Sequence, residues 1–118
     1  REPLGPAVRA GDDQWATIVR WVLYALIETE QRDLNSDNVD RVRENSTYPV
    51  VRWMLGSEGN VGEGLGLDAD WVYRVIRSVG NYGEVFERNL GSDSALKIKR
   101  GLNAPWMEGG LLYSPPFK

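Results

Sequence analysis

The sequence predicts a mainly α-helical chain with about five helices, a short N-terminal strand or extended segment, and an irregular C-terminal tail. Apolar residues recur every three or four positions over residues 13–31 and 71–79, which is the period of an amphipathic helix. Aspartates that can cap a helix precede both segments, and glycine follows the second one. Beyond residue 104, proline and glycine recur too often for regular structure.

Length and composition favour one domain over residues 1–118. A chain of 118 residues that is 42% hydrophobic and holds five tryptophans can bury a modest core. Its net charge is -3, and lysine and arginine are scattered along the chain, which argues against nucleic-acid binding. Cysteine and histidine are absent, so the chain lacks a thiolate nucleophile and the commonest general base and metal ligand. We therefore expect a protein that is not an enzyme and carries no cofactor.

The first elements are an extended segment and a long helix. Residues 4–9 are apolar but interrupted by glycine and proline, which favours a strand or extended segment over a helix. Asp12 and Asp13 can cap the helix that follows, which should end near Gln31. Because apolar residues surround its axis, we expect this helix to be covered on more than one side and to form the spine of the core.

Two shorter helices and a glycine-rich loop follow. Asn35 and Ser36 suit the cap of a weakly amphipathic helix around residues 37–44. Pro49 fits the first turn of a third helix, and Gly56 supplies the left-handed residue that closes it. Five glycines in residues 56–66 predict a loop between the two helical halves of the chain.

The second half contains two further helices. Asp68 or Asp70 can cap the helix over residues 71–79, and Gly80 can end it. Asn81 and Glu84 have the spacing of a capping box for a fifth helix that ends before residue 91. Farther on, residues 93–94 could cap a last helical segment at 95–100, and the remainder is predicted to be an irregular tail anchored by aromatic and leucine residues.

No pattern of reactive residues stands out. The glycine run lacks the Gly-Lys-Ser/Thr ending of a phosphate-binding loop, and no aspartate begins a calcium-loop pattern. Paired carboxylates could share acid and base duties, but solvated helix faces and caps explain them better. The pairs are Glu28 with Glu30, Asp68 with Asp70, and Glu84 with Glu87.

Large aromatic residues and one arginine are the remaining candidates for binding. The tryptophans could stack on a ligand, but four of them lie in apolar helical patterns, which favours core packing. They are Trp15, Trp21, Trp53, Trp71 and Trp106. Arg88 could hold a carboxylate in a bidentate fork, although an ordinary salt bridge or a tail contact is the simpler interpretation.

Three segments, in the same order along the chain, resemble one known family. They read REPLGPAVRAGDDQW at residues 1–15, NYGEVFERN at 81–89 and GLNAPWMEGGLLYSPPF at 101–117. Together they resemble the C-terminal portion of the periplasmic general L-amino-acid-binding proteins, which are type II periplasmic binding proteins and serve as receptors of ABC transporters. Complete proteins of this family are several times longer than this chain.

The resemblance implies a fragment of an α/β receptor lobe. In the complete proteins, two such lobes close over an amino acid, and the last part of the chain returns to the first lobe. The implied function of the parent is capture of an L-amino acid and its delivery to a membrane permease, without catalysis. A periplasmic parent is also implied. The first residues of this chain lack the apolar region of a signal peptide, so we expect that signal upstream of Arg1.

No ligand contact is transferred to this chain, because the residues that hold the amino acid in the family come mostly from earlier in the sequence. We therefore assign no catalytic, ligand-binding or metal-binding residue, and we expect the isolated chain not to bind the amino acid. A segment built to cover a sheet that it does not contain would expose apolar surface, which predicts a homo-oligomer that buries the helix over residues 13–31.

Two other functions remain open. The chain could be a free-standing helical interaction or assembly module that reuses the same scaffold. A small carboxylate-based enzyme is a weaker alternative, because no acid and base pair is recognisable in the sequence.

Overall fold

A computed structural model describes residues 4–117 and shows five α-helices within that range, in agreement with the sequence prediction. The helices are α1 (Asp13–Gln31), α2 (Val39–Asn45), α3 (Pro49–Met54), α4 (Trp71–Val79) and α5 (Tyr82–Asn89). Three short 3-10 helices lie between or after them: η1 (Glu63–Leu65), η2 (Gly101–Asn103) and η3 (Trp106–Glu108). No strand occurs between residues 4 and 117, so the N-terminal segment is extended but unpaired.

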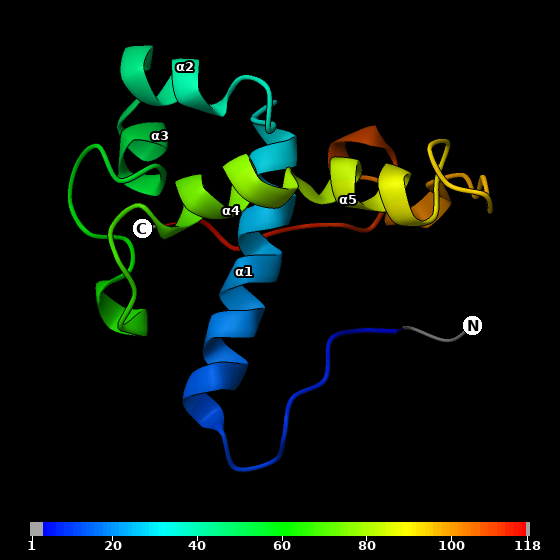
Figure 1. Cartoon of the computed structure of the whole chain (residues 1–118), viewed down its shortest axis with the longest axis horizontal. Helices are drawn as coiled ribbons and strands as arrows, with labels where there is room; N and C mark the ends of the chain where they lie inside the picture. The colour runs from blue at the N-terminus through cyan, green and yellow to red at the C-terminus, as the bar shows by residue number, and fades with distance from the viewer. Residues whose placement is uncertain (1–3, 118) are drawn as a thin grey trace.

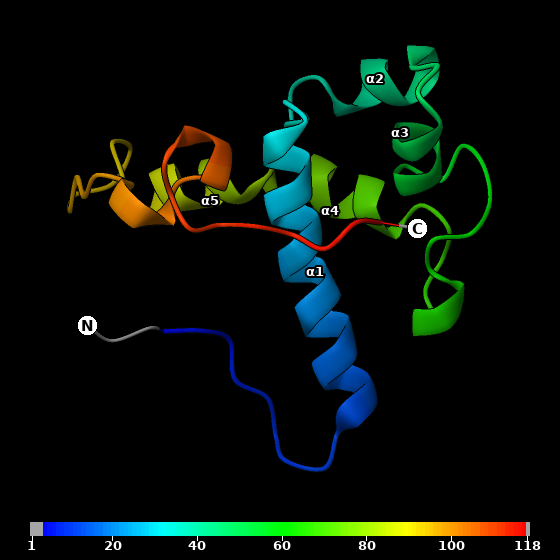
Figure 2. The ribbon, with the colours of Figure 1, turned by 180° about the vertical axis from the view of Figure 1, so that it is seen from behind.

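Helix α1 is the central element (Figure 1). Helix α4 crosses its C-terminal half, and α5 continues to one side of it; both contact α1. The C-terminal tail crosses α1 on the opposite face, as Figure 2 shows from behind. Buried residues of α1 occur only in this half, from Ala25 to Thr29. The prediction that α1 is covered on more than one side therefore holds for its C-terminal half, whereas its N-terminal half stays largely uncovered.

The hydrophobic core is formed by residues of α1, α2, α3 and α4 and of the segments between and after them. Its members are Ala25, Leu34, Val39, Val51, Met54, Leu55, Trp71, Val72, Ile76 and Phe117. Apart from Phe117, these residues belong to the helices or lie within three residues of a helix end. The side chains of Met54, Leu55 and Ile76 are fully buried. Burial of such apolar side chains is the main force that holds the helices together.

Local signals fix most helix ends. The Asp12 side chain accepts a hydrogen bond from the Trp15 backbone N–H at 3.1 Å, which caps α1. Pro49 occupies the first turn of α3, and Gly56 follows that helix with φ +79. Gly80 ends α4 with φ +83. These positions agree with the sequence prediction.

The predicted cap of α4 is confirmed in position at Asp70, although its side chain makes no capping hydrogen bond. Two local predictions were wrong. Asn35 and Ser36 do not cap α2; the Asn35 side chain accepts from the backbone N–H groups of Asp37 and Asn38, and so stabilises the turn before the helix. Residues 95–100 form no helix, because Ser94 accepts from the backbone N–H of Leu96 within a turn instead.

The chain has more surface than its size predicts. Its exposed area is 7867 Å², whereas a compact monomer of 13.3 kDa exposes about 6,450 Å². The radius of gyration is 14.7 Å, compared with about 13.5 Å for a typical domain of this length. Both comparisons indicate an excess of surface, of about 1,400 Å².

Candidate functional site

An aromatic cleft with a volume of about 560 Å³ is the first candidate for a binding site. It lies between α1, the loop that contains η1, and the ends of α3 and α4. Four aromatic side chains line it, together with two aliphatic, three polar and one glycine residue: Trp21, Trp53, Trp71, Phe117, Val61, Leu65, Thr17, Asn60, Glu63 and Gly64. We call this cavity the aromatic cleft below.

The aromatic walls of the cleft are held by packing. Phe117 lies 5.2 Å from the ring of Trp21 and 6.4 Å from that of Trp71, measured between ring centroids, and the pair with Trp21 is edge to face. The indole N–H groups of Trp53 and Trp71 are buried and have no hydrogen-bond partner among residues 4–117. A buried donor without a partner costs about 1–3 kcal/mol, so the packing of the rings must offset that cost.

The glycine-rich loop forms the outer wall of the cleft. A side chain at Gly59 would collide with the Trp53 ring, because an added Cβ would lie 2.1 Å from it. At Gly64 an added Cβ meets no atom within 4 Å, so this position faces open space. The loop between the helical halves that the glycine density predicts is thus present, although it contains the short helix η1.

Charge in the cleft comes from one residue. Glu63 is exposed, and its carboxylate makes no hydrogen bond or ion pair with another residue in the part of the chain that the structure describes. No lysine or arginine lines the cleft. The cavity therefore combines aromatic faces with a single negative charge, an arrangement that attracts cations and disfavours anions.

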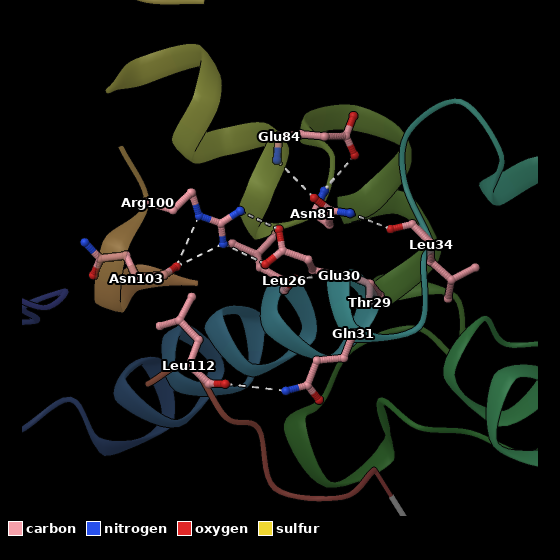
Figure 3. Close-up of polar contacts among 10 residues, drawn as sticks. All are labelled: Leu26, Thr29, Glu30, Gln31, Leu34, Asn81, Glu84, Arg100, Asn103 and Leu112. Atoms are coloured by element: carbon pink, nitrogen blue, oxygen red, sulfur yellow. Dashed lines mark hydrogen bonds and ion pairs between the residues drawn. The ribbon is translucent and has the colours of Figure 1, made fainter. Parts of the chain in front are cut away.

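A second cluster of polar side chains fastens the C-terminal tail to α1 (Figure 3). Arg100 donates two hydrogen bonds to the Glu30 carboxylate, at 2.7 and 3.0 Å. It also donates to the Asn103 carbonyl and lies over the rings of Tyr82 and Phe86. The hydrogen bonds from Arg100 to Glu30 raise the arginine pKa, although burial works against this. We call this cluster the tail junction.

The tail junction needs a glycine on α5. A Cβ at Gly83 would lie 1.9 Å from the Glu30 carboxylate and 3.0 Å from the Arg100 guanidinium. Glu30 and Arg100 retain only 14% and 19% of their side-chain exposure, so the ion pair lies partly buried against the helix. Gln31 adds a contact of 3.5 Å from its amide to the Leu112 carbonyl.

The predicted capping box of α5 is present and extends beyond the helix. Asn81 accepts from the Glu84 backbone N–H at 3.0 Å, and Glu84 accepts from the Asn81 backbone N–H at 3.0 Å. The Asn81 amide also donates to the Leu34 carbonyl, and Ser36 donates to Glu84. Burial raises the pKa of Glu84, but the hydrogen bonds from Ser36 and Asn81 outweigh burial and lower it.

The remaining carboxylate pairs and Arg88, which the sequence analysis considered as candidates, make ordinary salt bridges or hydrogen bonds within the chain. Glu28 pairs with Arg32 at 2.7 Å, and Arg74 pairs with both Asp68 and Asp70. The backbone and hydroxyl of Ser92 donate to Glu87 and lower its pKa. Arg88 donates to the Val79 carbonyl, so it neither holds a carboxylate nor forms the expected salt bridge among residues 4–117.

Core packing of the tryptophans is confirmed only in part. Trp71 is buried, and Trp21 and Trp53 are half-buried, whereas Trp15 and Trp106 are 52% and 53% exposed. The prediction was wrong for those two. Helical periodicity places Trp15 on an apolar face but does not tell whether the chain covers that face, and Trp106, expected to anchor the irregular tail, is exposed there instead. Nothing in the sequence pattern indicated that Trp21, Trp53 and Trp71 would meet around one cavity.

Comparisons with known proteins show that the chain is similar to one section of amino-acid-binding proteins of ABC transporters. Over 120 residues it is 54% identical to the general L-amino acid-binding periplasmic protein AapJ of Rhizobium johnstonii. The match covers all of this chain and 35% of AapJ. It is 48% identical to the glutamate/glutamine/aspartate/asparagine-binding protein BztA of Rhodobacter capsulatus, with the same coverage.

One solved structure has the same fold. A periplasmic binding protein of an ABC transporter from Brucella ovis, with glutathione bound, matches 94% of this chain with a TM-score of 0.87 and 48% identity. The chain spans about a third, 35%, of the length of that protein and of its curated relatives. A scan against protein-family models gave no match.

Proposed function

We propose that this chain, which is homologous along its whole length to amino-acid-binding proteins of ABC transporters, forms one section of a receptor that captures L-amino acids. The observation that carries the proposal is the sequence identity to these proteins, which is 48% and 54% over the entire chain. The fold agrees with it, because the solved structure matches this chain with a TM-score of 0.87. The receptor delivers its amino acid to a membrane permease and does no covalent chemistry. The parent is periplasmic, as the name of AapJ states for that relative.

Surface area supports a role as a packing section of a larger lobe. The excess of about 1,400 Å² over a compact monomer is larger than the share of about 800 Å² that one partner buries in a standard protein interface. Exposed apolar side chains occur in the N-terminal segment, on the N-terminal half of α1 and along the tail, where Leu4, Trp15, Leu96, Met107, Leu111 and Tyr113 are examples. The remainder of the receptor would cover these residues.

No side chain of this section contacts the transported amino acid in our proposal. The aromatic cleft offers no lysine or arginine for an α-carboxylate, because its lining holds one acidic residue and no basic one. The arginine of the tail junction is already bound to Glu30. We therefore expect the isolated chain, as a single domain, to fold without binding the amino acid.

A chimera tests the proposal. The relative from Rhizobium johnstonii, with its matching third replaced by this chain, should bind L-glutamate in isothermal titration, and the same relative without that third should not. The isolated chain, titrated with the same amino acid, should release no heat of binding. A chimera that folds by circular dichroism yet fails to bind would contradict the receptor role.

Self-association of the isolated chain follows from the same uncovered surface. We propose a homodimer or higher oligomer that buries the N-terminal half of α1, where Trp15 is exposed and none of residues 13–20 is buried. Light scattering over a concentration series should show a mass above 13.3 kDa. A constant monomer mass at high concentration would overturn this part of the proposal.

A free-standing interaction module is the alternative function, and the exposed apolar side chains of the tail are the observation that favours it. The genomic reading frame separates the two. A longer frame that encodes the remaining two thirds of a receptor supports the first function, and a frame that begins near Arg1 supports the second.

A further inference from the structure

We infer that the aromatic cleft is a binding site for a small organic cation with an apolar body, of the alkylguanidinium or alkylammonium class. The inference does not depend on the proposed receptor function, because it concerns a cavity that this chain forms alone. Its volume of about 560 Å³ lies within the range of about 300–1,000 Å³ that is usual for small-ligand sites.

Aromatic surface is the first argument for a cation. Trp21, Trp53, Trp71 and Phe117 all line the cleft, and tryptophan offers the most negative ring face of the natural side chains. A cation over such a face gains about 0.5–2 kcal/mol, depending on how far it is removed from water. An apolar ligand body would contact Val61 and Leu65 in the same cavity.

Charge is the second argument. Glu63 contributes the only charged side chain of the lining, and it makes no ion pair with another described residue. The neighbouring acidic residues of the loop differ in this respect, because Glu58 pairs with Arg52 and Asp68 pairs with Arg74. An organic cation in the cleft would give Glu63 an opposite charge that the chain itself does not supply.

The placement of the rings is the third argument. Phe117 packs edge to face on Trp21 at 5.2 Å and lies 6.4 Å from Trp71, measured between ring centroids. Trp71 is 6% exposed and Trp53 is half-buried, so packing holds these side chains in place. Aromatic walls that are fixed before a ligand arrives lose little conformational freedom on binding.

Matched probes separate charge from shape. Butylguanidinium and butylurea have similar size and polar geometry, but only the first is charged. In a ¹H–¹⁵N spectrum of the full chain, butylguanidinium should shift the indole resonances of Trp21, Trp53 and Trp71, while those of Trp15 and Trp106 stay fixed. We expect about fivefold tighter binding of butylguanidinium than of butylurea. Equal binding of the two probes, or equal shifts at all five tryptophans, would overturn the site.

Variants in the loop test the location without disturbing the core. Gly64 lines the cleft, and an added Cβ there meets no atom within 4 Å, so Gly64→Leu adds bulk at the cleft lining without a clash. It should weaken binding by more than tenfold, while Gly5→Leu, at another glycine with no atom near its Cβ, should leave binding unchanged. Glu63→Gln should weaken binding by about threefold, as expected for an exposed charge. Unchanged affinity in Gly64→Leu, with the native fold confirmed by circular dichroism, would contradict the assignment.

A third probe tells whether the cation is a free small molecule or a basic side chain of another protein. N-acetyl-arginine amide carries the same guanidinium on a peptide-like body, as a basic side chain of another protein would. Binding no tighter than that of butylguanidinium supports a free small molecule. Binding more than tenfold tighter would overturn that source in favour of a protein partner.

Discussion

Gly83 shows how a single missing side chain can permit a long-range contact. It is a buried residue in the first turn of α5, and glycine favours a helix less than alanine does. The Glu30 carboxylate and the Arg100 guanidinium occupy the space that its Cβ would fill. The cost of glycine is therefore offset by an ion pair that joins positions 70 residues apart.

The first prediction concerns this glycine. Gly83→Ala should destabilise the chain by about 1–2 kcal/mol, because the gain in helix propensity is smaller than the loss of the displaced ion pair. Urea unfolding followed by circular dichroism measures the change. In the Glu30→Gln background, where no charge pair remains to be displaced, the same substitution should cost less. An increase in stability in both backgrounds would show that Glu30 relocates freely.

The second prediction concerns the ion pair. Arg100→Met should lower the free energy of unfolding by about 2–4 kcal/mol, because it leaves the Glu30 carboxylate partly buried without its partner. Arg74→Met is a matched control, since both members of the Arg74 and Asp68 pair are exposed and such pairs contribute about 0–1 kcal/mol. Equal losses in the two variants would mean that the tail junction does not stabilise the fold.

At the scale of the helices, the sequence predicted where helices begin and end better than it predicted which helix faces pack together. Caps at Asp12 and Asn81 and helix ends at Gly56 and Gly80 were confirmed, because each depends on residues close in the chain. A helix at 95–100 was wrong, since Ser94 has equally local hydrogen bonds available in a turn. Neither the tail junction nor the aromatic cleft could be predicted, because periodicity holds no information on which distant faces meet.

The third prediction concerns the capping box of α5. The Glu84 pKa is lowered below its ordinary value of 4.5, so the folded state binds fewer protons than the unfolded state in mild acid. The stabilisation of the fold by ionised Glu84 is therefore complete above the unfolded-state pKa of 4.5, and it is lost as the pH falls through the lowered pKa of the folded state. Unfolding free energies measured between pH 6 and 3 should fall less steeply in Glu84→Gln than in the native chain.

At the scale of the whole molecule, the tail acts as a strap across α1. Its two fixed points are the tail junction at Arg100 and the packing of Phe117 between Trp21 and Trp71. Between them the tail passes over the face of α1 that α4 and α5 do not cover (Figure 2). The strap therefore completes the two-sided covering of the C-terminal half of α1.

The fourth prediction concerns the second fixed point. Phe117→Ala should destabilise the chain by about 3–4 kcal/mol, because Phe117 is 5% exposed and its removal leaves a cavity beside two tryptophans. Met107→Ala, at an exposed position of the same tail, should change stability by less than about 0.5 kcal/mol. Thermal unfolding followed by tryptophan fluorescence measures both. A small effect of Phe117→Ala would show that the tail is held by the tail junction alone.

Contact between Trp21 and Phe117 has a consequence for the order of events during folding. Most of the chain lies between these two rings, so the loop that their contact closes is long and its entropy cost is high. Contacts between helices that are nearer in the sequence, such as those of α2 with α4, close shorter loops and can form earlier. Trp21 therefore gains its edge-to-face neighbour late in folding, and until then its ring stays open to non-native contacts.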